Sequence, residues 1–341
     1  MEGDDVDPLL PVDPGHIGRY RLTHRLGAGG MGQVYLALTP SGRQLVVKVI
    51  RPEYAEDDEF RARFAREAEA ARHVGGFHTA QVVDADPGAD APWIATAYIP
   101  GPSLHAAVRA DGPMRGPELR ALVLGLAEGL EAVHACGLVH RDLKPENIIL
   151  AQDGPRIIDF GIARPLDATN LTATGAVFGT LAYMSPEQTE GQRVGPASDV
   201  FSLGTVLAFA ATGANPFAAE SMAATVRRLI GPPPPLVGVS DDVAGLITAC
   251  WARDPGTRPT PGRLLDSSGA QRPLPQTRSE EPVRTRRPPA GPSPTRPATG
   301  RQHRPEPEPQ RWIRRYRSLI VLLLLALFGL AMPSLFGALI G

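Results

Sequence analysis

The alternation of apolar and polar residues predicts a β-rich region followed by a mainly helical one. Four short runs alternate with the period of a strand and are separated by stretches rich in glycine, proline and serine. These predicted strands are Tyr20–Leu26, Gln33–Leu38, Gln44–Ile50 and Ile94–Ile99. Residues 56–74 instead repeat with helical spacing, which gives one apolar face. That face comprises Phe60, Phe64, Ala68 and Ala71.

The chain after Gly101 is patterned mainly for helices. The predicted helices are 117–135, 197–212, 219–230 and 241–252. The fold class is therefore α+β, with a small β-rich lobe at about 20–98 and a larger helical lobe at about 99–266. Ligands bind preferentially between two such lobes.

Both ends of the chain differ from this globular part. Residues 1–19 are predicted to be a flexible lead-in, because they are acidic and carry no periodic pattern. Residues 267–310 hold eleven prolines, eight arginines and four glutamates and almost no large apolar side chains. Such a segment cannot bury enough surface to offset its ordering entropy. We therefore expect 267–318 to be a disordered spacer that includes a basic juxtamembrane segment, although its prolines could also bind partner domains.

A run of 22 uncharged residues at 319–340 predicts a single transmembrane helix. Four arginines and two aromatic residues precede it directly, which suits a cytoplasmic membrane interface. These flanking residues are Arg311, Trp312, Arg314, Arg315, Tyr316 and Arg317. The alternatives are a buried core helix and a membrane-surface helix. With the span, we expect a single-pass protein of the cell membrane whose globular part is cytoplasmic.

Composition excludes several classes of protein. The formal net charge of −1 gives no electrostatic case for nucleic acid. Two cysteines, Cys136 and Cys250, form neither a disulfide framework nor a metal cluster. Lysine is rare: of the 35 basic residues only Lys48 and Lys144 are lysines. Arginine is a planar fork and lysine a compact point charge, so the two lysines indicate positions that need an ammonium.

The first lysine follows a glycine-rich loop. Residues 27–34 match the pattern G-x-G-x-x-G-x-V, in which glycines let backbone amides approach phosphate oxygens. Because this loop joins two predicted strands, it differs from the dinucleotide fingerprint and from the P-loop. Alternation places Lys48 on one face with Val46 and Ile50. A buried ammonium needs an anionic partner, and helical spacing puts Glu67 near the inward face of 56–74. Glu69 is expected to be solvated, and a surface position for Glu67 remains the simple alternative.

The second lysine lies in His140-Arg141-Asp142-Leu143-Lys144-Pro145-Glu146-Asn147, and Asp159-Phe160-Gly161 follows. Mg²⁺ binds through few protein oxygens together with substrate phosphates, so Asn147 and Asp159 suffice as ligands. Asp142 is then free to accept a hydroxyl proton, and Lys144 to neutralise charge on a transferring phosphoryl group.

At residues 20–266 the chain resembles the eukaryotic-like Ser/Thr protein kinases of bacteria, with the motifs in that family's order and spacing. The resemblance implies a two-lobed kinase fold that uses ATP and Mg²⁺. It implies that Asp142 is the catalytic base and that Lys48 forms an ion pair with Glu67. It also implies that Asn147 and Asp159 bind the magnesium ion. The remaining nucleotide-binding residues that it implies are Leu26, Gly27, Ala28, Gly29, Gly30, Met31, Gly32, Val34, Val46, Thr96, Ala97, Ile99 and Ile149.

The segment after Asp159 resembles a peptide-docking activation segment and indicates protein substrates. Glu187 in Ser185-Pro186-Glu187 is similar to the family's buried glutamate, with Arg258 as its partner. Asp199 resembles the residue that anchors the catalytic loop in this family. Lys144 and Thr180 together resemble the pattern of kinases that are specific for Ser and Thr.

Arg141 directly before Asp142 is the feature of kinases that loop phosphorylation activates. We therefore expect autophosphorylation at Thr172 and Thr174, with Thr169 less favoured. The alternative is that these threonines are ordinary loop residues.

An active, membrane-tethered Ser/Thr protein kinase in signal transduction is the leading interpretation. A pseudokinase or scaffold that binds nucleotide without turnover is the alternative. A receptor with its own external sensor is disfavoured. Three hypotheses for the activating signal remain open. They are contact with a partner membrane protein, homodimerisation, and lipid contact with the arginine cluster.

Overall fold

The structure, a computed structural model, describes residues 7–29, 32–161, 177–267 and no others. The expected threonine phosphosites, part of the glycine loop, most of the proline-rich segment and the apolar run at 319–340 lie outside these ranges. Among the helices that are described, none is both long enough and apolar enough to cross a bilayer.

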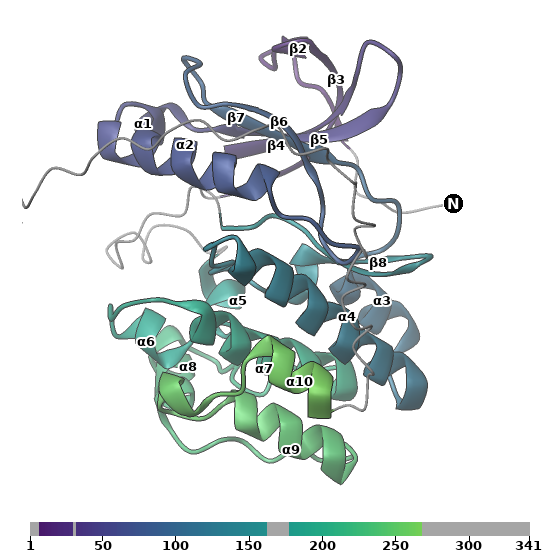
Figure 1. Cartoon of the computed structure of the whole chain (residues 1–341), viewed down its shortest axis with the longest axis vertical. Helices are drawn as coiled ribbons and strands as arrows, with labels where there is room; N and C mark the ends of the chain where they lie inside the picture. Colours follow the sequence, from purple (N-terminus) through teal and green to yellow (C-terminus); the bar gives the residue numbers. More distant parts are fainter. Residues whose placement is uncertain (1–6, 30–31, 162–176, 268–341) are drawn as a thin grey trace, which may run out of the picture. The chain divides into compact units, whose positions relative to one another are not determined.

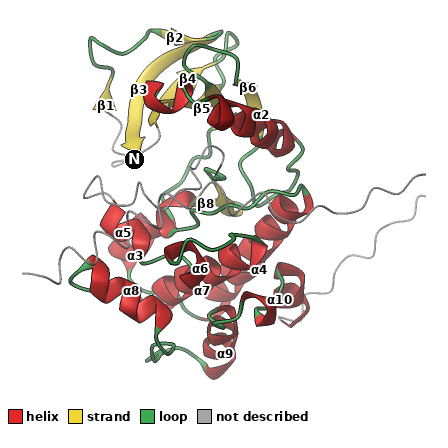
Figure 2. Ribbon diagram, turned by 90° about the vertical axis from the view of Figure 1, so that its left-hand side faces the viewer, coloured by secondary structure: helices red, strands yellow, loops and turns green. Residues whose placement is uncertain are grey.

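A twisted antiparallel sheet forms the first lobe (Figures 1 and 2). Its strands run in the order β1-β3-β4-β5-β7-β6, with β2 paired to β3. The bounds are β1 Asp7–Pro8, β2 His16–Ile17, β3 Tyr20–Gly29, β4 Gly32–Leu38, β5 Gln44–Ile50, β6 Val82–Asp86 and β7 Trp93–Ala97. Four of these strands match the predicted ones within a few residues. The sequence pattern missed β6, which contains two aspartates.

Helix α2 (Asp58–Arg72) packs on the sheet, after the short helix α1 (Pro52–Ala55). It begins where the side chain of Asp57 accepts hydrogen bonds from the N–H groups of Glu59 and Phe60, which satisfies two of the free donors of the first turn. The four predicted inward residues of this helix are all buried. Glu69 is exposed, as expected.

The residues before Tyr20 do not form the predicted flexible lead-in over their whole length. Strands β1 and β2 both pair with β3, and Leu9 and Ile17 pack against an apolar cluster that includes Tyr35 and Trp93. That cluster lies on the sheet face built by Leu45, Val47 and their neighbours, whereas Ile50 joins the core on the side of α2. Sequence reasoning missed this because two-residue strands carry no periodicity. Their stability comes from covering an apolar face that would otherwise meet water.

A hydrogen-bonded aspartate anchors this N-terminal segment. Asp13 accepts from Arg25 Nε at 2.6 Å and from the Tyr35 hydroxyl at 2.8 Å, and its side chain is 2% exposed. Hydrogen bonding from Arg25 holds the pKa of the Asp13 carboxyl well below its ordinary value.

The second lobe is helical and surrounds α7, a largely buried central helix. Its elements are α3 Leu104–Asp111, α4 Gly116–Ala135, η1 Pro145–Asn147, β8 Ile148–Ala151, β9 Gly154–Ile157, α5 Val177–Leu181, α6 Pro186–Thr189, α7 Pro196–Thr212, α8 Met222–Ile230, α9 Asp241–Cys250, η3 Pro255–Thr257 and α10 Pro261–Ser267. Helix α7 is apolar on all sides and is buried from Ser198 to Ala211. It starts with Pro196 and ends at Gly213 in the left-handed region, with φ 78°. The two-lobed α+β architecture is confirmed.

Candidate active site

Three of the predicted site residues meet in the loop between α4 and β8. The Lys144 Nζ lies 3.2 Å from Asp142 Oδ2. Asn147 Nδ2 donates to the backbone carbonyl of Asp142 at 2.8 Å, with Oδ2 of the same residue at 3.4 Å. The side chains of Asp142 and Lys144 keep 24% and 22% of their surface exposed, so a substrate group can reach them.

Asp199 holds this loop from the first turn of α7. Its two carboxylate oxygens accept from the N–H groups of His140 and Arg141, each at 2.8 Å. His134 Nε2, at the end of α4, lies 2.7 Å from Asp199 Oδ2. A carboxylate with 1% of its side chain exposed therefore has three hydrogen-bond partners, which makes its burial tolerable. The anchoring role expected of Asp199 is confirmed, whereas His134 was not foreseen.

The two functional loops are in close backbone contact. The backbone of Gly161 lies so near His140 that a Cβ on this glycine would stand 2.2 Å from the His140 carbonyl oxygen. His140 Nε2 lies 3.0 Å from the carbonyl oxygen of Ile158. Complete burial lowers the pKa of the His140 imidazole, against the opposing influence of nearby aspartates. Through these contacts His140 joins the two loops.

The partner of Lys48 differs from the predicted one. Its Nζ lies 3.1 Å from Asp159 Oδ2, and Glu67 Oε1 instead accepts from Arg141 Nη1 at 2.8 Å. All four side chains are partly buried, with between 15% and 35% of their surface exposed. Helical spacing correctly placed Glu67 on the inward side of α2, but the sequence alone cannot tell which of two cations it meets. That choice depends on the tertiary positions of Arg141 and Asp159.

Backbone strain occurs in the same two loops. Arg141 and Asp159 are the non-glycine residues with positive φ in the described part of the chain, at 61° and 55°. Such conformations persist only where neighbouring contacts hold them, and they cluster at functional sites. Both residues belong to the ion pairs described above.

The sheet brings three of the predicted nucleotide-binding residues, Val34, Val46 and Thr96, to one face with Lys48. Lys48 is paired with Val34 on one side and with Ile94 on the other, and Val46 is paired with Thr96. Directly opposed residues of antiparallel strands share a face. The Ala97 N–H already donates to the Gln81 carbonyl at 2.9 Å, so this N–H is not available to an adenine edge. Ile149 on β8 pairs with Ser103 just before α3. Leu26 within β3 and Ile99, two residues after β7, are both half-buried.

The glycine loop connects β3 and β4, as predicted, but Gly30 and Met31 at its tip lie outside the described residues. Gly27 pairs with Val34 and Ala28 with Gln33, and Gly29 with Gly32. Gly32 also has a structural reason to lack a side chain. A Cβ there would stand 2.0 Å from the Val49 carbonyl oxygen.

The donor set fits a magnesium nucleotide. Asn147 turns its amide nitrogen to Asp142, which leaves its oxygen for a cation, and the Ile158 N–H donates to the Asn147 carbonyl directly before Asp159. Oxygen ligands of this kind suit Mg²⁺. Within the described ranges no three His, Cys, Asp or Glu side chains gather around one point, so phosphate oxygens would have to complete the coordination.

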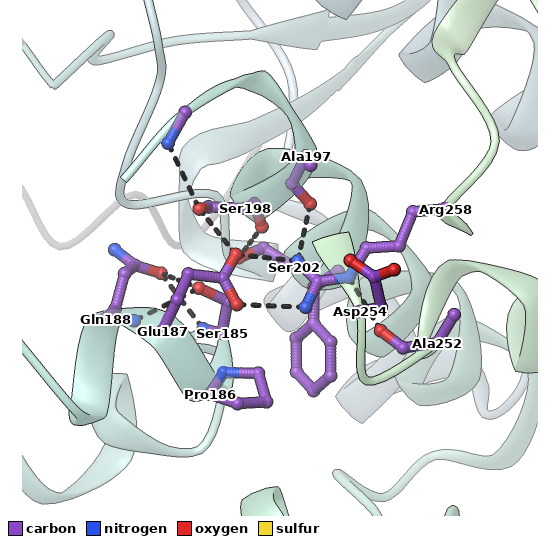
Figure 3. Close-up of polar contacts among 12 residues, drawn as sticks. Ser185, Pro186, Glu187, Gln188, Ala197, Ser198, Ser202, Ala252, Asp254 and Arg258 are labelled. Carbon is purple, nitrogen blue, oxygen red and sulfur yellow. Dashed lines mark hydrogen bonds and ion pairs between the residues drawn. The ribbon is translucent and has the colours of Figure 1, made fainter. Parts of the chain in front are cut away.

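A buried ion pair fixes the end of the activation segment (Figure 3). Arg258 Nη1 and Nη2 lie 2.6 Å and 2.9 Å from the two oxygens of Glu187, and Ser198 Oγ donates to the first of these at 2.7 Å. Arg258 also donates to the carbonyls of Ala197 and Ala252. Burial by itself would raise the pKa of the Glu187 carboxyl, but the hydrogen bonds from Arg258 and Ser198 outweigh it and the pKa is lowered.

The described part of the activation segment also reaches the catalytic loop. Lys144 Nζ lies 3.4 Å from Thr180 Oγ1, as its Ser/Thr-type pattern suggested. Gln188 Nε2 donates to the Arg141 carbonyl at 3.0 Å. Sequence reasoning missed this second contact, because a glutamine after Ser-Pro-Glu looks like an ordinary residue of a short helix. The predicted phosphosites Thr169, Thr172 and Thr174 lie outside the described residues.

Known proteins with similar sequences include bacterial kinases. A family model described as the protein kinase domain matches residues 20–268. A probable serine/threonine-protein kinase PkwA of Thermomonospora curvata is 67% identical over 260 residues, which are 76% of this chain and 35% of the relative. The serine/threonine-protein kinase AfsK of Streptomyces coelicolor is 52% identical over 76% of this chain and 32% of its own length. The chain thus spans about a third of these curated relatives.

A solved structure has the same fold. The crystal structure of the PknI kinase domain of Mycobacterium tuberculosis is 28% identical, with a TM-score of 0.60, and the match covers 76% of this chain and 99% of that domain. The match with PknI, the family match over 20–268 and the arrangement of the loops agree with one another. On this combined basis the chain belongs to the protein kinase family.

Proposed function

We propose that this protein is an active Ser/Thr protein kinase that uses ATP and Mg²⁺ to phosphorylate hydroxyl groups of protein substrates. The observation that carries the proposal is the cluster around Asp142. Its carboxylate lies 3.2 Å from the Lys144 ammonium, and its backbone carbonyl accepts a hydrogen bond from the side chain of Asn147. The names of the relatives and the family match support the same reaction class.

Each residue of the cluster has a separate task in this proposal. Asp142 accepts the proton of the substrate hydroxyl as that oxygen attacks. Lys144 stabilises negative charge beside it, and Lys48 binds phosphate oxygens of the nucleotide. Asn147 and Asp159 hold the magnesium ion, which when bound neutralises charge on the phosphates.

A transfer assay with labelled ATP tests this against the alternative of a pseudokinase. The wild-type chain should label itself and a generic Ser/Thr peptide, and Asp142→Asn should abolish both while nucleotide still binds. Labelling that survives in Asp142→Asn would exclude the proposed base. Nucleotide binding without any turnover in the wild type would favour the scaffold.

We further propose that phosphorylation of Thr172 and Thr174 activates the enzyme. The ion pair between Arg141 and Glu67 supports this proposal. Arg141 is the cation that a phosphothreonine would be expected to bind, and Glu67 is its partner here. A phosphate carries nearly two negative charges and would compete with the single charge of Glu67 for Arg141. Glu67 would then be released for Lys48. Changing both threonines to alanine should strongly lower activity, with Thr169→Ala as the control. Full activity of the double variant would refute this regulation.

Attachment to the cell membrane is also a proposal, with the kinase domain in the cytoplasm. Its support is the uncharged run 319–340 and the arginines before it. The full chain should remain in the membrane fraction after alkaline extraction, whereas a chain that ends at residue 318 should not. Release of the full chain by alkali would instead indicate a surface helix. A full chain that stays soluble throughout would favour a core helix.

A further inference from the structure

The side chain of Gln188 connects the end of the activation segment to the catalytic loop. Its Oε1 accepts from the Ser185 N–H at 2.9 Å, and its Nε2 donates to the Arg141 carbonyl at 3.0 Å. Both partners are backbone groups whose donor or acceptor character is fixed, so only one orientation of the amide satisfies them. Figure 3 shows the contacts between Gln188 and Ser185, which form a capping box at the start of α6.

The carbonyl that Gln188 holds belongs to the peptide group joining Arg141 to Asp142. Because a peptide unit is planar, any rotation of this carbonyl also rotates the N–H of Asp142 and shifts its Cα. Arg141 has a φ of 61°, which a non-glycine residue adopts only where its surroundings hold it. Asp199 holds the preceding N–H at 2.8 Å, and the Asp142 N–H donates to the His140 carbonyl at 2.8 Å. Gln188 thus completes a set of contacts from three directions.

We propose that Gln188 is a positioning residue for phosphoryl transfer. Its amide holds the Arg141–Asp142 peptide in the orientation that directs the Asp142 carboxylate towards the substrate hydroxyl. The proposal rests on the proposed role of Asp142 as base.

Two substitutions separate the halves of the contact. Gln188→Glu keeps an acceptor for the Ser185 N–H, since glutamate also forms capping boxes, but puts an oxygen against the Arg141 carbonyl. Gln188→Lys keeps a donor for that carbonyl and loses the acceptor. We expect Gln188→Glu to lower kcat about 10-fold or more, as small misplacements of a reacting group do, with the KM values for ATP and peptide unchanged. Gln188→Lys should retain most of the wild-type kcat.

The pH dependence adds a signature that a merely structural role would not produce. A protonated carboxyl can donate to the Arg141 carbonyl, so the kcat of Gln188→Glu relative to wild type should rise as the pH falls towards the pKa of a carboxyl. Gln192→Glu is the matched control, because Gln192 is exposed and its side-chain amide donates to Glu190 and not to the catalytic loop that the structure describes. This control should behave like the wild type throughout.

Several results would overturn the proposal. These are an unchanged kcat in Gln188→Glu, a larger loss in Gln188→Lys than in Gln188→Glu, or a loss confined to the peptide KM. Circular dichroism checks that each full-length variant is folded. If Gln188→Glu does not fold, Gln188→Met, which lacks the donor but keeps the shape, carries the same expectation. Activity that persists in Asp142→Asn would instead overturn the proposed function, so the two failures can be told apart.

Discussion

The ion pair between Glu187 and Arg258 should dominate the stability of the helical lobe. The Arg258 guanidinium is 0% exposed and the Glu187 side chain 4% exposed. Gln in place of Glu187 keeps the size and one acceptor, so it creates no cavity, but it leaves the arginine charge buried without an anion. Breaking a buried pair from one side costs about 3–5 kcal/mol. Since the amide oxygen still accepts one hydrogen bond, we expect Glu187→Gln to lower the free energy of unfolding by about 3 kcal/mol.

Acid should remove this difference. The pKa of Glu187 is lower in the folded chain than its ordinary value of 4.5. Its stabilisation is therefore complete above pH 4.5 and is lost as the pH falls through the folded-state pKa, where the wild type becomes as neutral as the variant. The gap between the two free energies of unfolding should be constant near neutral pH and should narrow in acid.

Urea unfolding of the two chains, followed by far-ultraviolet circular dichroism at several pH values, measures this gap. Glu190→Gln is the control, because the pair of Glu190 with Arg253 at 3.5 Å is exposed and should be worth less than about 1 kcal/mol. A loss of less than about 1 kcal/mol in Glu187→Gln, equal to that of the control, would refute the reasoning. So would a gap that does not depend on pH.

Three further changes should have distinct effects. Lys48→Arg should lower kcat about 100-fold in the labelled-ATP assay, because a guanidinium cannot replace the compact ammonium beside Asp159; full activity would contradict this. Gly161→Ala should destabilise the chain by about 1–3 kcal/mol in urea unfolding, since its Cβ would overlap the His140 carbonyl, whereas Gly245→Ala, with open space around it, should not. Asp13→Asn should speed proteolysis of the N-terminal segment at neutral pH but not in strong acid. The pKa of Asp13 is lowered in the folded chain, so its stabilisation is present above the ordinary pKa of 3.8 and is lost as the pH falls through the folded-state pKa. Equal cleavage of both chains at neutral pH would contradict this prediction.

Local patterns predicted the elements that are long or strongly periodic. The inward face of α2 was predicted because helical spacing is a property of neighbouring residues, and the face of β5 because side chains alternate along a strand. The pattern failed for β6, whose aspartates hide the alternation, and for β1 and β2, which are too short to show one. These elements exist because other parts of the sheet pair with them.

Some contacts of the candidate site could likewise be predicted from the sequence. Asp142, Lys144 and Asn147 come together because only a few residues separate them, so their spacing sufficed to predict the cluster. Asp159 is joined to them through the adjacent hairpin of β8 and β9. Motif order likewise predicted the pair of Glu187 and Arg258, 71 residues apart in the chain.

By itself the sequence determined the long periodic elements and the reaction class that its motifs indicate, and it predicts a need for an ammonium at two positions. Only the tertiary structure decided which partners Lys48, Glu67 and Gln188 meet. Lys48 contacts Asp159, Glu67 contacts Arg141, and Gln188 reaches the Arg141 carbonyl. The physical reason is that an ion pair or hydrogen bond depends on distances of a few ångströms between elements far apart in the chain. Periodicity can assign a side chain to a face, but it cannot choose between two partners on that face.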